Sequence, residues 1–194
     1  MRPAAVVVGF VAVTVALGSA SGQGGTRRRR MAFTGGAGLM YGNLAGGDFG
    51  ATKAAVGFDA NAGVVLRRWQ LGIGYDRTNH GRNDTDGDYV VSNVYVEPRL
   101  LFGSVDARFA PYAAVRAGRA MASYVGVLGI TDKATGYVAG LGAGLTWRVT
   151  GSVQADAAGY YARLSHDYGT GGFAAAETGG QASVRLGVRL VAGR

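Results

Sequence analysis

Hydrophobic and polar residues alternate with a period of two along most of this chain, most clearly from Tyr137 to Trp147. Every odd-numbered position of that segment is apolar, both of its ends are aromatic, and its even-numbered positions are mostly glycine. Successive side chains of a β-strand point to opposite faces, so the pattern predicts a strand with one apolar face. Ten steps of about 3.3 Å, tilted by roughly 40°, project to about 25 Å, the height of the apolar band of a membrane-spanning barrel. The two aromatic residues therefore fall at the two expected membrane interfaces.

Eight such runs follow one another, separated by turn-forming residues. The fifth run is the least regular, because Arg116 and Arg119 have opposite parity, and one of them is expected above the apolar band or beside a β-bulge. The predicted strands are Met31–Gly42, Lys53–Leu66, Arg68–Thr78, Tyr89–Phe102, Arg108–Ser123, Tyr137–Trp147, Ser152–Ser165 and Gly180–Val191.

The connections between these runs alternate in length. Long connections are expected at 43–52, 79–88, 124–132 and 166–179, with short turns between them. Barrels of the outer membrane have long extracellular loops and short periplasmic turns. A strand in lipid also needs backbone partners on both sides, which only a closed barrel supplies. The pattern predicts an all-β fold, an eight-stranded antiparallel up-and-down transmembrane β-barrel.

The first residues have the organisation of a cleavable signal peptide. Arg2 precedes an apolar run over Ala4–Leu17, and Gly18 and Ala20 are small residues at the −3 and −1 positions of a cleavage site. The apolar run is shorter than the roughly 20 residues that a membrane helix needs. We expect a signal peptide over 1–20, with cleavage after Gly22 or Gln23 as the alternatives, a basic tail over 21–30 and the barrel over 31–194.

Composition and charge narrow the choice of class. Glycine is abundant, with 35 of 194 residues, and the absence of cysteine excludes a disulfide scaffold. Half of the net charge of +8 is the run Arg27–Arg30, and no basic stripe is interleaved with aromatic residues, so nucleic-acid binding is not expected. Acidic residues concentrate in the long connections and arginines in the short ones. This distribution predicts an acidic outer rim and a basic inner rim that contacts lipid phosphates.

The segment Asn93–Leu100, read with the loop rhythm, resembles the fourth-strand region of a known group. This group is the small eight-stranded outer-membrane barrels of the OmpA/OmpX type, and the resemblance covers residues 31–194. It implies a bacterial outer-membrane location, outer-membrane lipids as partners, surface ligands bound through loops, a monomer and no cofactor.

Charged residues of both signs fall on the inward face of the predicted strands. An eight-stranded barrel is only wide enough for side chains to fill it, and buried charges need partners. We therefore expect an ion-paired plug, with a gated ion path as the alternative, and an aromatic girdle on the outside. The predicted lumen network is Asp59, Asp76, Glu97, Arg99, Arg148, Asp156, Arg185 and Arg189, and the predicted girdle is Trp69, Tyr75, Tyr137 and Trp147.

No catalytic, cofactor-binding or metal-binding residues are expected. The pair Ser165–His166 is the best candidate for a nucleophile and base, but neighbours on a strand point to opposite faces, and His166 is expected as a solvated rim residue. The acidic segment Asn83–Asp88 lacks the distal glutamate of a calcium loop.

The sequence thus predicts a non-enzymatic barrel that stabilises the envelope or presents loops for surface contacts. Two alternatives remain. The first is an outer-membrane lipid-modifying enzyme similar to a lipid A deacylase. The second is a soluble lipocalin-like binder, whose apolar face would point inward.

Overall fold

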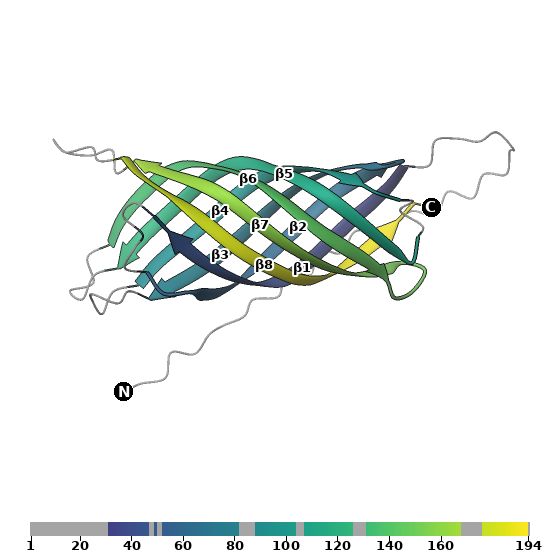
Figure 1. Cartoon of the computed structure of the whole chain (residues 1–194), viewed down its shortest axis with the longest axis horizontal. Coiled ribbons are helices and arrows are strands. Elements are labelled where there is room, and N and C mark those ends of the chain that lie inside the picture. The colour runs from purple at the N-terminus through teal and green to yellow at the C-terminus, as the bar shows by residue number, and fades with distance from the viewer. Residues whose placement is uncertain are drawn as a thin grey trace, which may run out of the picture.

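Eight antiparallel strands form a closed barrel in chain order, with β1 paired to β8 (Figure 1). The computed structural model describes residues 31–46, 49, 52–81, 88–103, 107–125, 131–167 and 176–193. The predicted signal peptide and basic tail lie outside these residues. The strands are β1 (Met31–Ala45), β2 (Ala55–Leu66), β3 (Trp69–Gly81), β4 (Asp88–Leu101), β5 (Phe109–Val125), β6 (Thr131–Arg148), β7 (Val153–Asp167) and β8 (Ala176–Ala192).

The predicted fold class is confirmed, and the strand bounds differ mainly at one end. We call the end at the left of Figure 1 the upper mouth, where the connections cover 46–54, 82–87, 126–130 and 168–175. The end at the right, where β1 begins and β8 ends, is the lower mouth, with connections over 67–68, 102–108 and 149–152. The expected alternation of long and short connections fails at 102–108, which is longer than 82–87 and 126–130. β6 begins at Thr131 rather than Tyr137, because its first residues continue the ladder with β5 up to Val125. This ladder extends past the apolar band, where the alternation that marks a membrane strand is lost. Among the described residues, no helix is long and apolar enough to cross a bilayer.

The strand register fixes how the barrel is tilted. Following register partners from Gly35 around all eight strands leads back to β1 at Ala45, ten residues further along. With about 3.3 Å per residue and about 4.8 Å between strands, this offset corresponds to a tilt of about 40°. One residue along a strand then changes the height by about 2.5 Å, and one step to the next strand raises the register partner by about 3 Å. Heights along the barrel axis can therefore be compared between strands.

The apolar face of the strands points outward. Large apolar side chains on the outer wall are well exposed, for example Leu141 at 67% and Leu186 at 62%. The alternate positions point into the lumen and are buried, and many of them are polar or charged. The lipocalin-like alternative required the opposite arrangement and is therefore wrong. A wall of this kind needs lipid around it.

Candidate functional site

The lumen holds a continuous network of ion pairs, which begins at Arg116 on β5. The guanidinium of Arg116 donates from Nη1 to Asp76 Oδ2 at 2.7 Å and from Nη2 to Glu97 Oε2 at 2.8 Å. Its carbon Cζ lies 3.7 Å from the ring centre of Tyr95 and 4.2 Å from that of Tyr160. Arg116 is therefore held by charge on its edge and by aromatic rings on its faces.

The network continues towards the lower mouth through Arg99. Arg99 donates from Nε to Glu97 Oε1 at 2.5 Å and from Nη1 to Asp156 Oδ2 at 3.3 Å. Its guanidinium also lies over the ring of Tyr112, at 4.7 Å from the ring centre. Glu97 is thus shared between two arginines, Arg99 and Arg116.

Asp156 on β7 is the second shared carboxylate. It accepts from Arg185 Nη2 at 2.7 Å and from Arg189 Nη2 at 2.8 Å. Arg185 also donates to Asp59 Oδ2 at 3.3 Å, and Arg189 donates to Gln70 Oε1 at 3.0 Å. The network therefore joins β2, β3, β4, β5, β7 and β8 across the lumen.

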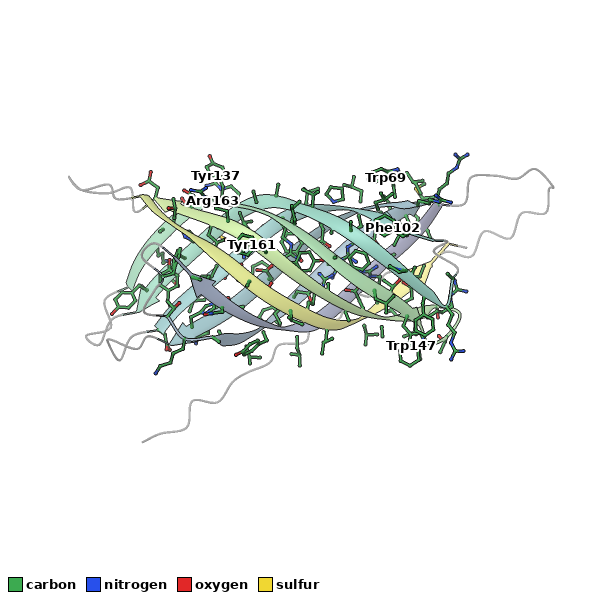
Figure 2. The ribbon with its side chains drawn as sticks, viewed as in Figure 1. Trp69, Phe102, Tyr137, Trp147, Tyr161 and Arg163 are labelled. Atoms are coloured by element: carbon green, nitrogen blue, oxygen red, sulfur yellow. The ribbon has the colours of Figure 1, made fainter. Side chains whose placement is uncertain are left out.

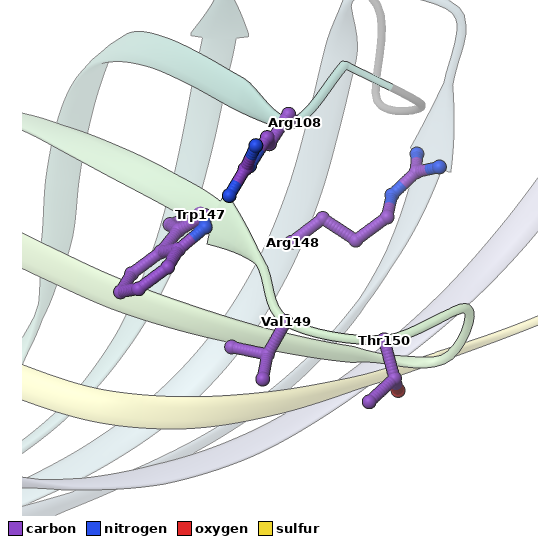
Figure 3. A pocket seen from close by; sticks show the side chains of 5 residues that line it. All are labelled: Arg108, Trp147, Arg148, Val149 and Thr150. Atoms are coloured by element: carbon purple, nitrogen blue, oxygen red, sulfur yellow. The ribbon is translucent and has the colours of Figure 1, made fainter.

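Seven of the eight predicted lumen residues lie together in this network, and Arg148 takes a different place. Arg148 lies half-buried at the end of β6, where it lines a hollow of about 370 Å³ with Arg108, Trp147, Val149 and Thr150 (Figure 3). Arg148 has the alternation of an inward position, as predicted, but it lies at the lower mouth and not among the ion pairs of the lumen.

Arg116 was missed, although the even positions of β5 around it, Ala114, Gly118 and Ala120, are small enough to leave room for a large inward side chain. Its companion Arg119 points outward. The register from Val96↔Ala117 to Arg99↔Ala114 runs without an offset, so no bulge is needed to explain the irregular parity.

With Arg116 included, the network is balanced in charge. Four carboxylates (Asp59, Asp76, Glu97 and Asp156) face four guanidinium groups (Arg99, Arg116, Arg185 and Arg189), and all eight residues are buried. A charge-neutral, hydrogen-bonded set is the arrangement that makes burial of ions tolerable.

Glycines make room for the tyrosines of the network. A methyl group added to Gly74 would overlap the ring of Tyr95, and one added to Gly142 would overlap the ring of Tyr160. Gly144 is related to Tyr112 in the same way. The glycine-rich inward face of β6 is therefore a requirement of the packing in the lumen.

Apolar residues enclose the network above and below. Near the lower mouth, the cluster includes Ala32, Val65, Leu101 and Val191. Near the upper mouth, a second cluster contains Leu44, Phe49, Tyr89, Val91, Val138 and Leu164. The ion pairs are thus sandwiched between two apolar layers.

His166 lies beside the upper cluster and is completely buried, contrary to the expectation of a solvated rim residue. It pairs with Gly136, one position beyond Tyr137 towards the upper mouth, so it lies above the apolar band. Its ring meets Phe49 edge to face at 5.9 Å, and neither ring nitrogen has a hydrogen-bond partner among the described residues. Burial without a partner lowers the pKa of His166 below its ordinary value.

His80 is buried at the same end of the barrel but is hydrogen-bonded. Its Nδ1 lies 2.9 Å from the carbonyl oxygen of Lys53, and its Nε2 lies 2.9 Å from Thr78 Oγ1. Burial lowers the pKa of His80, and the bond to Lys53 opposes that shift. Both histidines are therefore neutral groups at neutral pH.

The structure separates the candidate pair Ser165–His166. His166 points into the lumen, and Ser165, its neighbour on the same strand, points to the opposite face. Among the described residues, no three His, Asp or Glu side chains form a possible metal site. Of the acidic segment Asn83–Asp88, only Asp88 is described.

The predicted girdle residues lie at different heights. Trp69 and Trp147 lie at the lower end of the outer wall with Phe102, and Tyr137 lies near the upper end (Figure 2). Tyr75 lies about halfway along β3, is half-buried and donates to Ser92 Oγ at 3.3 Å. It is therefore placed below the upper interface.

Comparison with solved structures identifies the fold. Neisserial surface protein A (NspA) matches with a TM-score of 0.64 and 19% identity, over 82% of this chain and 97% of that chain. Ail of Yersinia pestis, solved with the heparin analogue sucrose octasulfate, matches with a TM-score of 0.57 and 16% identity, over 84% and 99%. OprG of Pseudomonas aeruginosa matches with a TM-score of 0.57 and 10% identity, over 86% and 98%. The sequence matches no protein-family model and no curated protein.

The chain is therefore a small eight-stranded β-barrel of the outer-membrane type. Its apolar outer wall requires a bilayer, and barrels with such a wall span the bacterial outer membrane.

Proposed function

We propose that the protein is a non-conducting, non-enzymatic barrel that stabilises the outer membrane and holds its upper connections at the cell surface. The observation that carries this proposal is the neutral ion-pair network across the lumen. A network of this kind links six strands and supports a rigid wall better than a passage for solutes.

The packing of the lumen supports the absence of an ion path. The side chains of Arg185, Tyr95 and Tyr112 are among the largest fully buried ones. An ion that entered would have to displace a guanidinium from Asp156 or Glu97, each of which accepts from more than one arginine. Leaving one of those charges without its partner in the interior costs several kcal/mol.

The geometry of Ser165 and His166 argues against the lipid-modifying alternative. A nucleophile and its base must be within hydrogen-bond reach, and these two side chains point to opposite faces. The carboxylates of the lumen network are buried and engaged in ion pairs, so they do not offer a second candidate on the outer wall.

Recordings from planar bilayers test the proposal. The folded protein should give no unitary current steps, whereas the variant Arg185→Ala with Tyr160→Ala, which empties the middle of the lumen, serves as the positive control. Regular current steps of the unaltered protein would contradict the proposal. Turnover of lipid A that is lost in Ser165→Ala and His166→Ala would instead favour the enzyme.

A further inference from the structure

Three arginines point outward from alternate strands of the barrel. Arg77 on β3, Arg119 on β5 and Arg163 on β7 are all exposed. We call them the arginine arc. Arg119 is paired in register with Tyr137.

The register places the three arginines at one height. Arg163 pairs with Ala139, two residues below Tyr137 on β6. Arg77 pairs in register with Ser92 on β4, and Ser92 pairs with Met121 on β5, two residues above Arg119. From one arginine of the arc to the next, two steps between neighbouring strands raise the register partner by about 6 Å. The next arginine lies two residues lower along its strand than that partner, which takes away about 5 Å. The Cα atoms of the arc therefore lie within about 3 Å of one another in height.

The arc lies at the upper edge of the apolar band, at the level of Tyr137. Figure 2 shows Arg163 beside Tyr137, with Tyr161 further towards the middle of the wall. Within the described part of the chain, no ion pair or hydrogen bond engages the side chain of Arg77, Arg119 or Arg163. In a bilayer, these guanidinium groups face the lipid headgroups.

A groove on the outer wall runs below Arg163, across β6, β7, β8 and the upper half of β1. Its volume is about 700 Å³, and its lining is mainly apolar. Gly159 forms an open part of its floor, because a Cβ added there would meet no atom within 4 Å. The floor and walls include Gly159, Ala143, Ala182, Leu141, Tyr161 and Val184.

The arginine arc covers only one part of the circumference of the barrel, from β3 to β7. At the height of the arc, the outward residues of β1, β2 and β8 are Asn43, Val56 and Ala182, none of which is charged. An even ring of arginines would indicate only general anchoring at the interface. An arc of arginines beside an apolar groove is the arrangement expected for one bound amphiphile with an anionic head.

We propose that this part of the wall binds a phosphorylated, multiply acylated lipid of the outer leaflet. The guanidinium groups of Arg119 and Arg163, on either side of Tyr137, bind its phosphates, and one acyl chain lies in the groove over Gly159. Arginine is suited to phosphate because its planar fork donates two parallel hydrogen bonds. The inference rests on the proposed orientation, with the upper mouth outside, and it revises the expected acidic outer rim at the level of the wall.

Native mass spectrometry of the full barrel in detergent micelles tests the site. The probes are hexa-acylated lipid A with two phosphates, the same lipid without phosphates, and a diacyl phosphatidylglycerol. The bisphosphorylated lipid should bind at least about tenfold more tightly than each of the others, which corresponds to about 1.4 kcal/mol. Arg119→Gln with Arg163→Gln should remove this preference.

Matched controls separate the head site from the groove. Arg68→Gln removes an exposed arginine at the lower mouth and should leave binding unchanged. Gly159→Leu fills the groove and should weaken binding of both lipid A forms. Gly35→Leu adds the same side chain at another glycine where an added Cβ has no atom within 4 Å, and it should not weaken binding.

Several results would overturn the site. They are unchanged binding by the double arginine variant, an equal loss in Arg68→Gln, equal binding of phosphatidylglycerol, or unchanged binding by Gly159→Leu. Heat-modifiable gel migration shows whether each variant is folded. If the variants fold, conduct no ions and bind lipid unchanged, this site is wrong while the proposed function stands.

Discussion

Arg116 Nη1 lies 2.7 Å from Asp76 Oδ2, although the two residues belong to β5 and β3 and β4 runs between them. The contact is possible because Arg116 points into the lumen and reaches past the inward face of β4. Strands that are not neighbours in the sheet are thereby joined inside the barrel.

The first prediction concerns the loss of that bridge. Arg116→Met should lower the free energy of unfolding by about 3–5 kcal/mol, because Asp76 and Glu97 lose a buried partner. Urea unfolding in lipid vesicles measures this cost. Arg68→Met, at an exposed site, should cost less than about 0.5 kcal/mol.

Adding Asp76→Asn to Arg116→Met should recover part of the loss, because one uncompensated carboxylate is removed. An equal, small cost for Arg116→Met and Arg68→Met would show that the network does not hold the lumen together.

The second prediction concerns the glycines beside the tyrosines. Gly142→Val should cost about 1–3 kcal/mol, because its side chain overlaps the ring of Tyr160. Gly159→Val introduces the same side chain on the outer wall. A Cβ added at Gly159 has no atom within 4 Å, so this variant should cost far less. Urea unfolding of the two variants in the same vesicles gives the comparison. Equal costs would mean that lumen packing does not require glycine.

The third prediction concerns pH. Because burial lowers the pKa of His166, the imidazole of His166 binds a proton less readily in the folded protein than in the unfolded chain. The contribution of neutral His166 is complete well above the ordinary pKa of 6.5 and declines as the pH falls below it. His166→Phe should make the free energy of unfolding less dependent on pH between about 7.5 and 5, where carboxylates contribute equally to both proteins.

Equilibrium unfolding at a series of pH values measures this difference, and His80 contributes a remaining slope of the same sign. An unchanged slope in His166→Phe would show that His166 is accessible to protons in the folded barrel.

The alternation of residues was sufficient to predict eight strands and the face to which each side chain points, because both follow from the period of two. It does not say where along a strand the lumen ends. Arg148 and Arg189 both have inward parity, yet Arg148 lies at the mouth and Arg189 reaches Asp156. Nor does it reveal partners distant in sequence. His166 is buried partly because Phe49, from the connection after β1, packs against it.

The start of β6 shows a further limit. Above the apolar band the outer face of a strand meets water instead of lipid, so the apolar stripe on that face ends while the hydrogen-bonded ladder continues. Thr131–Gly136 therefore extends the strand without an apolar stripe, and its pairing with β5, joined at Thr135 and Gly136 by pairing with β7, reveals it.

The central claim is that lipid covers the apolar wall while the charged face is sealed inside. The most direct measurement is the free energy of unfolding of Leu186→Arg in lipid vesicles, compared with Val149→Arg. Leu186 is exposed near the middle of the wall, whereas Val149 is exposed at the lower mouth. Leu186→Arg should cost about 2–4 kcal/mol and Val149→Arg about 0–1 kcal/mol. A cost near zero for Leu186→Arg would contradict the account.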